Sequence, residues 1–199
     1  MIKEKKQKQT KSKSLSESRG QNKKEAATSL IADLASHNDT KRVKARHSLV
    51  AMGKATVPLL TEALKSRNSL MRWEAAKALG EIGDPGTASA LVDALEDEDF
   101  DVRWLAAEGL TKLNILALKP LLQALEKRGD SILLQEGAHH VFHDLAKGGL
   151  RKFLAPVLAA LEALEPGVEV PWAAQREMVV EVPWAARKAV DMLEKTEKL

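Results

Sequence analysis

The sequence predicts an all-α, right-handed solenoid of about four to five helical pairs, and three observations lead to this prediction. Residues 71–79 (MRWEAAKAL) return thirty-one residues later as residues 102–110 (VRWLAAEGL). Within each copy the apolar residues follow the spacing of one helix face. A second motif, Leu-x-x-Ala-Leu, recurs at near-constant spacing. A fixed period of this length with helical spacing inside it is typical of stacked helical pairs. The second motif stands at Leu60/Ala63/Leu64, Leu91/Ala94/Leu95 and Leu121/Ala124/Leu125, and in looser form at Val157/Ala160/Leu161.

The segment 71–85 carries a recognisable order of residue types. An apolar residue and Arg are followed by two spacers, Ala-Ala, one spacer and Ala-Leu-Gly, and then by Gly-Asp-Pro. This order resembles the HEAT-like repeat of the phycobiliprotein-lyase type. The resemblance implies helical hairpins whose second helices line the concave face of the array.

The elements follow from this period. Residues 1–24 are expected to be a disordered basic tail, and residues 25–199 a repeat domain that opens with a capping helix at Ala26–Ser36. Gly83 is expected to end one helix, Asp84-Pro85 to begin the next, and Asp99 to cap the helix near Phe100. The approximate repeats are 38–66, 67–97, 98–128, 129–165 and 169–199.

Two repeats need separate treatment. Residues 41–49 align with 71–79, which places Arg42 with Arg72. In the fourth repeat the helix Ser131–Leu145 places Leu134 where Arg72 and Arg103 stand. In the fifth unit a short helix is expected from Pro171, a break or kink at Pro183, and a final helix to about Glu197.

Composition excludes several classes of function. The chain has no Cys, which rules out disulfides, a thiolate nucleophile and a Cys-based metal site. Charges interrupt every apolar segment before about 18 residues, so no transmembrane helix is expected. The N-terminus lacks the apolar core of a secretory signal, and a cytoplasmic location is expected.

The charge is unevenly distributed. Residues 1–24 hold nine Lys or Arg and two Glu, a net charge of +7, which leaves −4 for the remaining chain because the total is +3. Such a tail fits an anionic surface, either nucleic acid or lipid headgroups. The alternatives are a solubilising tail, favoured by its lack of aromatic residues for base stacking, or a plug that folds back onto the repeat domain.

Two Trp residues at equivalent positions are candidate partner-binding residues. Trp73 and Trp104 lie off the core stripe of their helices, so stacking of repeats would bring the two indoles to one flank. Because Trp is enriched at binding hot spots, this flank is a candidate recognition surface. The alternative is that each indole lies across the neighbouring repeat and seals the groove between them.

The second helices offer another candidate surface. Opposite the Leu/Ala stripe, the sequence predicts a row of polar residues that includes the partner-binding candidates Glu62, Asp93, Glu96, Gln123 and Glu126, with Lys65, Ala159 and Glu162 at further positions of the same row. We call the five candidates the second-helix row. On a concave face they would form a partly acidic groove for a basic peptide or protein. The alternative is an ordinary solvated helix face.

The remaining polar residues favour structural roles. Arg42, Arg72 and Arg103 are expected to form an internal ladder with acidic residues at the turns, such as Asp84. His139 and His143 are four residues apart and share a helix face, the spacing of a two-imidazole metal grip. No third ligand is evident, so no metal and no cofactor are expected.

Among enzymes with this repeat, the deoxyhypusine hydroxylases resemble the chain in fold but need repeated His-Glu pairs for a di-iron site. The corresponding pairs here are Trp73-Glu74, Trp104-Leu105 and Gln135-Glu136, so the His is missing from each. No catalytic residue is expected. The sequence therefore favours a non-catalytic interaction or scaffold module, with a chaperone-like bilin or chromophore lyase subunit, or a nucleic-acid-associated protein acting through residues 1–24, as alternatives.

Overall fold

The computed structural model of the chain describes residues 21–163 and 172–196. The expected disorder of residues 1–20 lies outside the described residues, whereas residues 21–24 begin a helix that runs to residue 33. The helices that follow are α2 (Asp39–Met52), α3 (Val57–Ala63), α4 (Ser69–Ile82), α5 (Ala88–Ala94), α6 (Phe100–Leu113), α7 (Ile115–Arg128), α8 (Ile132–Leu145), α9 (Arg151–Glu162) and α10 (Trp172–Thr196).

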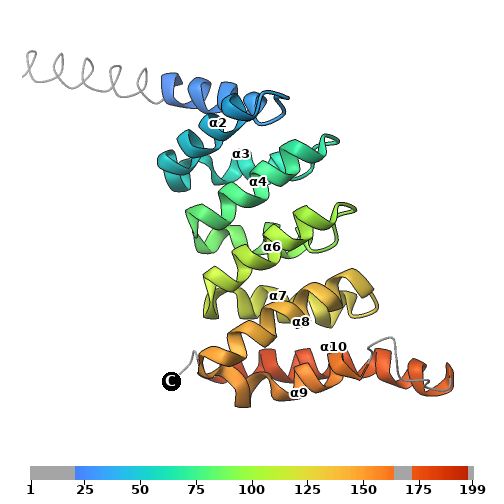
Figure 1. Cartoon of the computed structure of the whole chain (residues 1–199). Helices are drawn as coiled ribbons and strands as arrows, with labels where there is room; N and C mark the ends of the chain where they lie inside the picture. The colour runs from blue at the N-terminus through green and yellow to red at the C-terminus, as the bar shows by residue number, and fades with distance from the viewer. Residues whose placement is uncertain (1–20, 164–171, 197–199) are drawn as a thin grey trace, which may run out of the picture.

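The helices stack as a solenoid, which confirms the predicted all-α architecture. The first helices of the repeats, α2, α4, α6 and α8, pack in consecutive order, and the second helices lie behind them (Figure 1). The turns between repeats form one edge of the stack and the turns within repeats form the opposite edge. Each repeat therefore buries its apolar face mainly against its neighbours.

Local signals in the sequence set the ends of the first helices. Each begins after a residue whose side chain accepts a hydrogen bond from a backbone N–H of the first turn, as expected for an N-cap. These caps are Asn38, Asn68, Asp99 and Ser131. The predicted cap at Asp99 and the predicted end at Gly83 are confirmed. Asp84 caps the 3₁₀ turn Pro85–Thr87 that leads into α5.

A recurring hydrogen bond closes each turn between repeats. The side chains of Arg42, Arg72 and Arg103 donate to the carbonyl oxygen six residues earlier, at 2.8, 3.0 and 2.8 Å. In the fourth repeat Gln135 donates to the Gly129 carbonyl in the same way. The expectation that Leu134 takes the Arg position is therefore wrong by one residue, because Gln135 stands four residues after its cap Ser131, as the three arginines stand four residues after theirs.

The core consists mainly of Leu and Ala, and glycine permits the closest helix approach. A Cβ added to Gly80 on α4 would lie 3.1 Å from the Cα of Gly109 on α6. The two backbones therefore come closer than any side chain at these positions would allow.

Helix α10 differs from the prediction. It continues through Pro183, so of the expected break or kink there the break is wrong and the kink stays a prediction. The helix packs against α7 and α9. A Cβ on Gly129 would lie 2.6 Å from Cγ of Pro183, so the missing side chain of Gly129 leaves room for the proline ring. The proposed limits of the fifth unit, 169–199, stay a prediction because residues 164–171 and 197–199 lie outside the described part.

Candidate functional site

The junction between the first two repeats contains a buried ion cluster. The carboxylate of Glu74 on α4 is 1% exposed and accepts hydrogen bonds from Nε of Arg42 at 2.9 Å and Nε of Arg46 at 2.8 Å, both on α2. Arg46 also pairs with Glu81, and Arg42 with Asp39. Since buried charges need such partners, the ion pairs of Glu74 hold α2 and α4 together.

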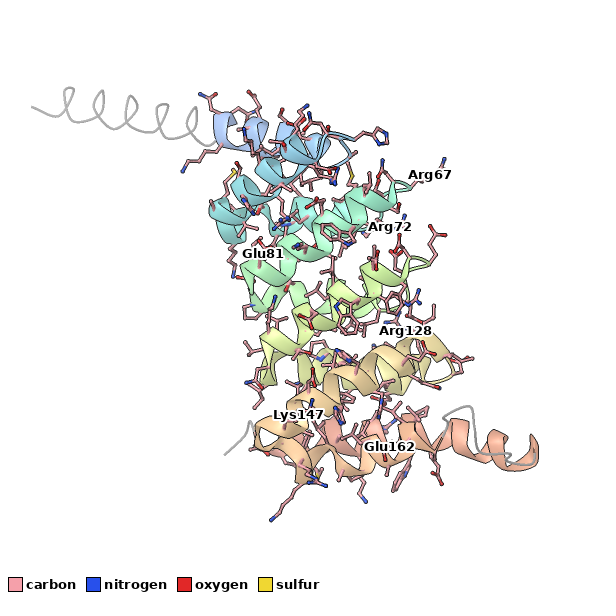
Figure 2. All side chains as sticks on the ribbon, in the orientation of Figure 1. Arg67, Arg72, Glu81, Arg128, Lys147 and Glu162 are labelled. Atoms are coloured by element: carbon pink, nitrogen blue, oxygen red, sulfur yellow. The ribbon has the colours of Figure 1, made fainter. Side chains whose placement is uncertain are left out.

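A second buried arginine joins the next two repeats. Arg72 donates from Nε to Asp97 at 2.8 Å and from Nη2 to Glu98 at 3.0 Å. The hydrogen bonds that Arg72 donates to Asp97 raise the pKa of Arg72, while burial acts in the opposite direction. Arg72 lies toward the edge formed by the turns between repeats (Figure 2).

The predicted arginine ladder is thus confirmed at Arg42 and Arg72, but the expected acidic partner was wrong. Asp84 pairs with Lys54 at 3.4 Å, and the ladder uses Glu74 and Asp97 instead. Arg103 donates hydrogen bonds to the backbone carbonyls of Asp97 and Glu98 instead of pairing with a carboxylate. Its guanidinium lies 5.5 Å from the centre of the Phe100 ring.

The two candidate indoles differ in their exposure to solvent. Trp73 is partly buried against the core, and Nζ of Lys77 lies 4.7 Å from its ring centre. Trp104 is 46% exposed. Trp73 is therefore the more buried of the two indoles and Trp104 the more exposed, and the role of both in partner binding stays a prediction.

Trp104 belongs to a small aromatic cluster that sequence reasoning did not assemble. Its ring lies 6.4 Å from that of Phe100, which is 63% exposed, and 4.9 Å from that of His140 on α8. We call Phe100, Trp104 and His140 the Trp104 flank. Phe100 could have been found from its i, i+4 spacing to Trp104, but the contact with His140 depends on how α6 and α8 stack.

The charged members of the second-helix row lie on or just after α3, α5 and α7, and each has a cationic partner. Lys65 lies 3.1 Å from Glu62, Arg128 pairs with Asp93 at 3.0 Å and also with Glu96, and Arg187 lies 3.3 Å from Glu126. Gln123 is half-buried. The acidic character expected from sequence is therefore largely compensated within the chain.

The histidines of α8 share a face as expected, with the rings of His139 and His143 6.2 Å apart. Nε2 of His139 lies 3.8 Å from Glu162, and Nε2 of His140 lies 3.9 Å from Asp144. In the described part of the chain, no group of three or more His, Cys, Asp or Glu residues is arranged to hold a metal ion.

Comparison with known proteins adds two findings. The family described as HEAT repeats matches residues 27–111 and 57–139, which together cover more than half of the chain. The chain is also similar to the phycocyanobilin lyase subunit alpha of Picosynechococcus sp. (strain ATCC 27264 / PCC 7002 / PR-6), with 38% identity over 72 residues. That match covers 36% of this chain and 27% of the relative. Among the helices of residues 21–163 and 172–196, none is both long and apolar enough to cross a membrane.

Proposed function

The chain belongs to the HEAT-repeat family, and from this premise we propose that it is a non-catalytic protein-interaction module that binds its partner through the Trp104 flank. HEAT arrays are quasi-one-dimensional and present extended surfaces to partners. The observation that supports this surface is the exposure of Trp104, at 46%, beside Phe100, at 63%. Solvent-exposed aromatic residues in contact with each other are the residue types that dominate binding energy at interfaces.

The charges around this flank favour a basic partner. Glu98 is 85% exposed, and Asp101 is also exposed, one residue after Phe100. The guanidinium of Arg103 over the Phe100 ring shows that this ring accepts a cation on its face. A Lys or Arg side chain of a partner would find the same two features, an aromatic face and nearby carboxylates.

The second-helix row is a weaker candidate for the same partner. Beside the Trp104 flank Glu98 pairs with Arg72, but Asp101 has no cationic partner among the described residues. The carboxylates of the second-helix row, at positions 62, 93, 96 and 126, are all paired with cations of this chain. A basic partner would have to replace those contacts, so the gain in binding free energy would be small.

The test is affinity purification of a partner with the wild-type chain, followed by measurement of its affinity for variants. Phe100→Ala/Trp104→Ala should weaken binding by about thirtyfold or more, because loss of a hot-spot residue costs about 2 kcal/mol or more. Asp101→Lys should slow association, since rim charges act mainly on the association rate.

Ile115→Ala is the matched control, because Ile115 is 58% exposed and is the first residue of α7, two residues beyond the end of α6 that is opposite Phe100. It should bind as the wild type does. Retention of the partner by Phe100→Ala/Trp104→Ala at unchanged stability would refute the assignment of this flank. Loss of binding in Glu62→Lys/Asp93→Lys/Glu96→Lys alone would transfer the site to the second-helix row.

A second candidate function is that of a bilin lyase subunit, and its support is the similarity to the phycocyanobilin lyase subunit alpha. The test is to mix the protein with phycocyanobilin and record the absorbance spectrum. A shifted band would favour this function over the interaction module. An unchanged spectrum would show that the chain does not bind this bilin directly and would count against the lyase function.

The third candidate, nucleic-acid binding through residues 1–24, is supported by the net charge of +7 in that segment. Deletion of residues 1–20 should abolish duplex DNA binding, and affinity of the full chain should fall steeply with salt. Binding that survives the deletion would contradict it.

A further inference from the structure

A groove opens between α9 and α10, away from the surfaces discussed above. It has a volume of about 470 Å³ and is lined by Pro156, Ala159, Ala160, Glu181, Trp184 and Ala185. Trp184 is 60% exposed. Pro156 and Ala159 on α9 are exposed as well. Apart from Glu181, the groove therefore offers solvent a continuous apolar surface of small residues beside one large aromatic ring.

Two opposite charges of α10 lie on either side of Trp184. Glu181 precedes it by three residues and Lys188 follows it by four, so the three side chains share one helix face. Both charged residues are exposed, and Nζ of Lys188 lies 4.8 Å from the ring centre of Trp184. The midpoint between positions 181 and 188 falls between Trp184 and Ala185.

This pattern is complementary to itself. If two α10 helices cross in antiparallel orientation with Trp184 near the two-fold axis, Glu181 of each copy lies opposite Lys188 of the other. A two-fold interface requires the same patch to be its own complement, and a helix face with opposite charges on either side of an aromatic residue meets that requirement.

We propose that the groove between α9 and α10 binds a second copy of this chain, with a two-fold axis near Trp184. Each Trp184 lies against Pro156 and Ala159 of the other copy, and each Glu181 pairs with Lys188 of the other copy. The apolar contact supplies most of the binding free energy, and the two ion pairs fix the antiparallel orientation. This interface is separate from the Trp104 flank, so its failure would leave the proposed function unaffected.

Sedimentation equilibrium of the full chain at loading concentrations up to about 100 μM tests the proposal. The wild type should be a dimer in equilibrium with monomer. Trp184→Ala should raise the dimer dissociation constant by about thirtyfold, as for a hot-spot residue. Because Trp184 is exposed, this variant should keep the wild-type circular dichroism spectrum and melting temperature.

Charge reversal gives the more specific test. Glu181→Lys and Lys188→Glu should each weaken self-association by about tenfold or more, because each places like charges opposite each other. An equimolar mixture of the two variants should dimerise again, since Lys at 181 in one copy then faces Glu at 188 in the other. Glu136→Lys, at an exposed position of α8, is the control and should dimerise as the wild type does.

Three results would overturn the proposal. A monomer over the whole concentration range would show that the groove serves something other than a second copy. A dimer unaffected by Trp184→Ala would place the interface elsewhere. Single charge variants that do not recover on mixing would exclude the antiparallel arrangement.

Discussion

Replacing Glu74 with Ala removes the carboxylate that Arg42 and Arg46 share at the junction of α2 and α4. The carboxylate is 1% exposed, and the side chains of Arg42 and Arg46 are 14% and 7% exposed. Removing one member of a buried ion pair costs about 3–5 kcal/mol because the remaining charge is left without its partner. Arg42 would keep Asp39 and Arg46 would keep Glu81, so we expect the lower end, about 3 kcal/mol.

For a chain of this size, such a loss corresponds to a fall in melting temperature of about 6–12 °C. Urea denaturation followed by circular dichroism measures the free energy of unfolding, with Glu62→Ala as the control. Glu62 lies on the surface in an exposed pair with Lys65, so its loss should change the stability by less than about 0.5 kcal/mol.

The position of the damage provides the sharper criterion. Because repeats contact mainly their neighbours, faster amide hydrogen exchange should appear in α2 and α3 and not in α8 and α9. A loss of less than about 1 kcal/mol, the usual value for a surface pair, would refute the idea that this cluster holds the first two repeats together. Uniformly faster exchange along the chain would refute the local nature of the junction.

Three further predictions concern backbone and charge. Gly109→Ala should destabilise the fold by about 1–3 kcal/mol, because its Cβ would lie 2.9 Å from a buried Leu side chain and 3.2 Å from the α4 backbone, whereas Gly148→Ala, with nothing within 4 Å, should be neutral in the same urea titration. Asn114 has φ 54°, so Asn114→Ala should cost about 1–2 kcal/mol while Asn114→Gly should not lower the urea midpoint. The hydrogen bond that Lys147 donates at 2.7 Å lowers the pKa of Asp144 in the folded chain. The stability that ionised Asp144 contributes is therefore fully present above the ordinary carboxyl pKa and is lost as pH falls through the lowered pKa of the folded state. Lys147→Ala should raise the pKa of Asp144 in an NMR titration and reduce that acid-dependent loss of stability.

The local features of the fold could be read from the sequence because they depend on nearby residues. The N-cap at Asp99 and the helix end at Gly83 involve contacts over a few positions. The period of the repeat follows from two copies of one segment. These signals were sufficient for the architecture.

The partners of charged residues could not be read in the same way. Arg42 reaches Glu74, thirty-two positions away, and Arg187 reaches Glu126, sixty-one positions away. Which acid meets which base depends on the stacking of helices, so Asp84 was expected in a place that Glu74 occupies. For the same reason the sequence predicted a row of acids on the second helices but not the cations that compensate it.

Pro183 shows a different limit. A proline within a helix normally predicts a break, since it removes a backbone hydrogen bond and its ring needs space. Here the proline ring packs closely against Gly129, in the turn between α7 and α8, where a Cβ would lie 2.6 Å from Cγ of the proline. This neighbour lies fifty-four positions from the proline, beyond the reach of a local pattern.

The junctions between repeats also bear on how an array of similar units avoids assembling in the wrong order. Residues 71–79 and 102–110 are so alike that these segments alone do not prevent α4 and α6 from exchanging places during folding. Yet α2 meets α4 through the carboxylate of Glu74, α4 meets α6 through Gly80 and Gly109, and α6 meets α8 through Trp104 and His140. A shifted assembly would place Leu105, which stands at the position of Glu74, against two guanidinium groups and leave them without a counter-charge. Each boundary thus accepts a single neighbour, and the order of the repeats is determined by the few residues in which the repeats differ.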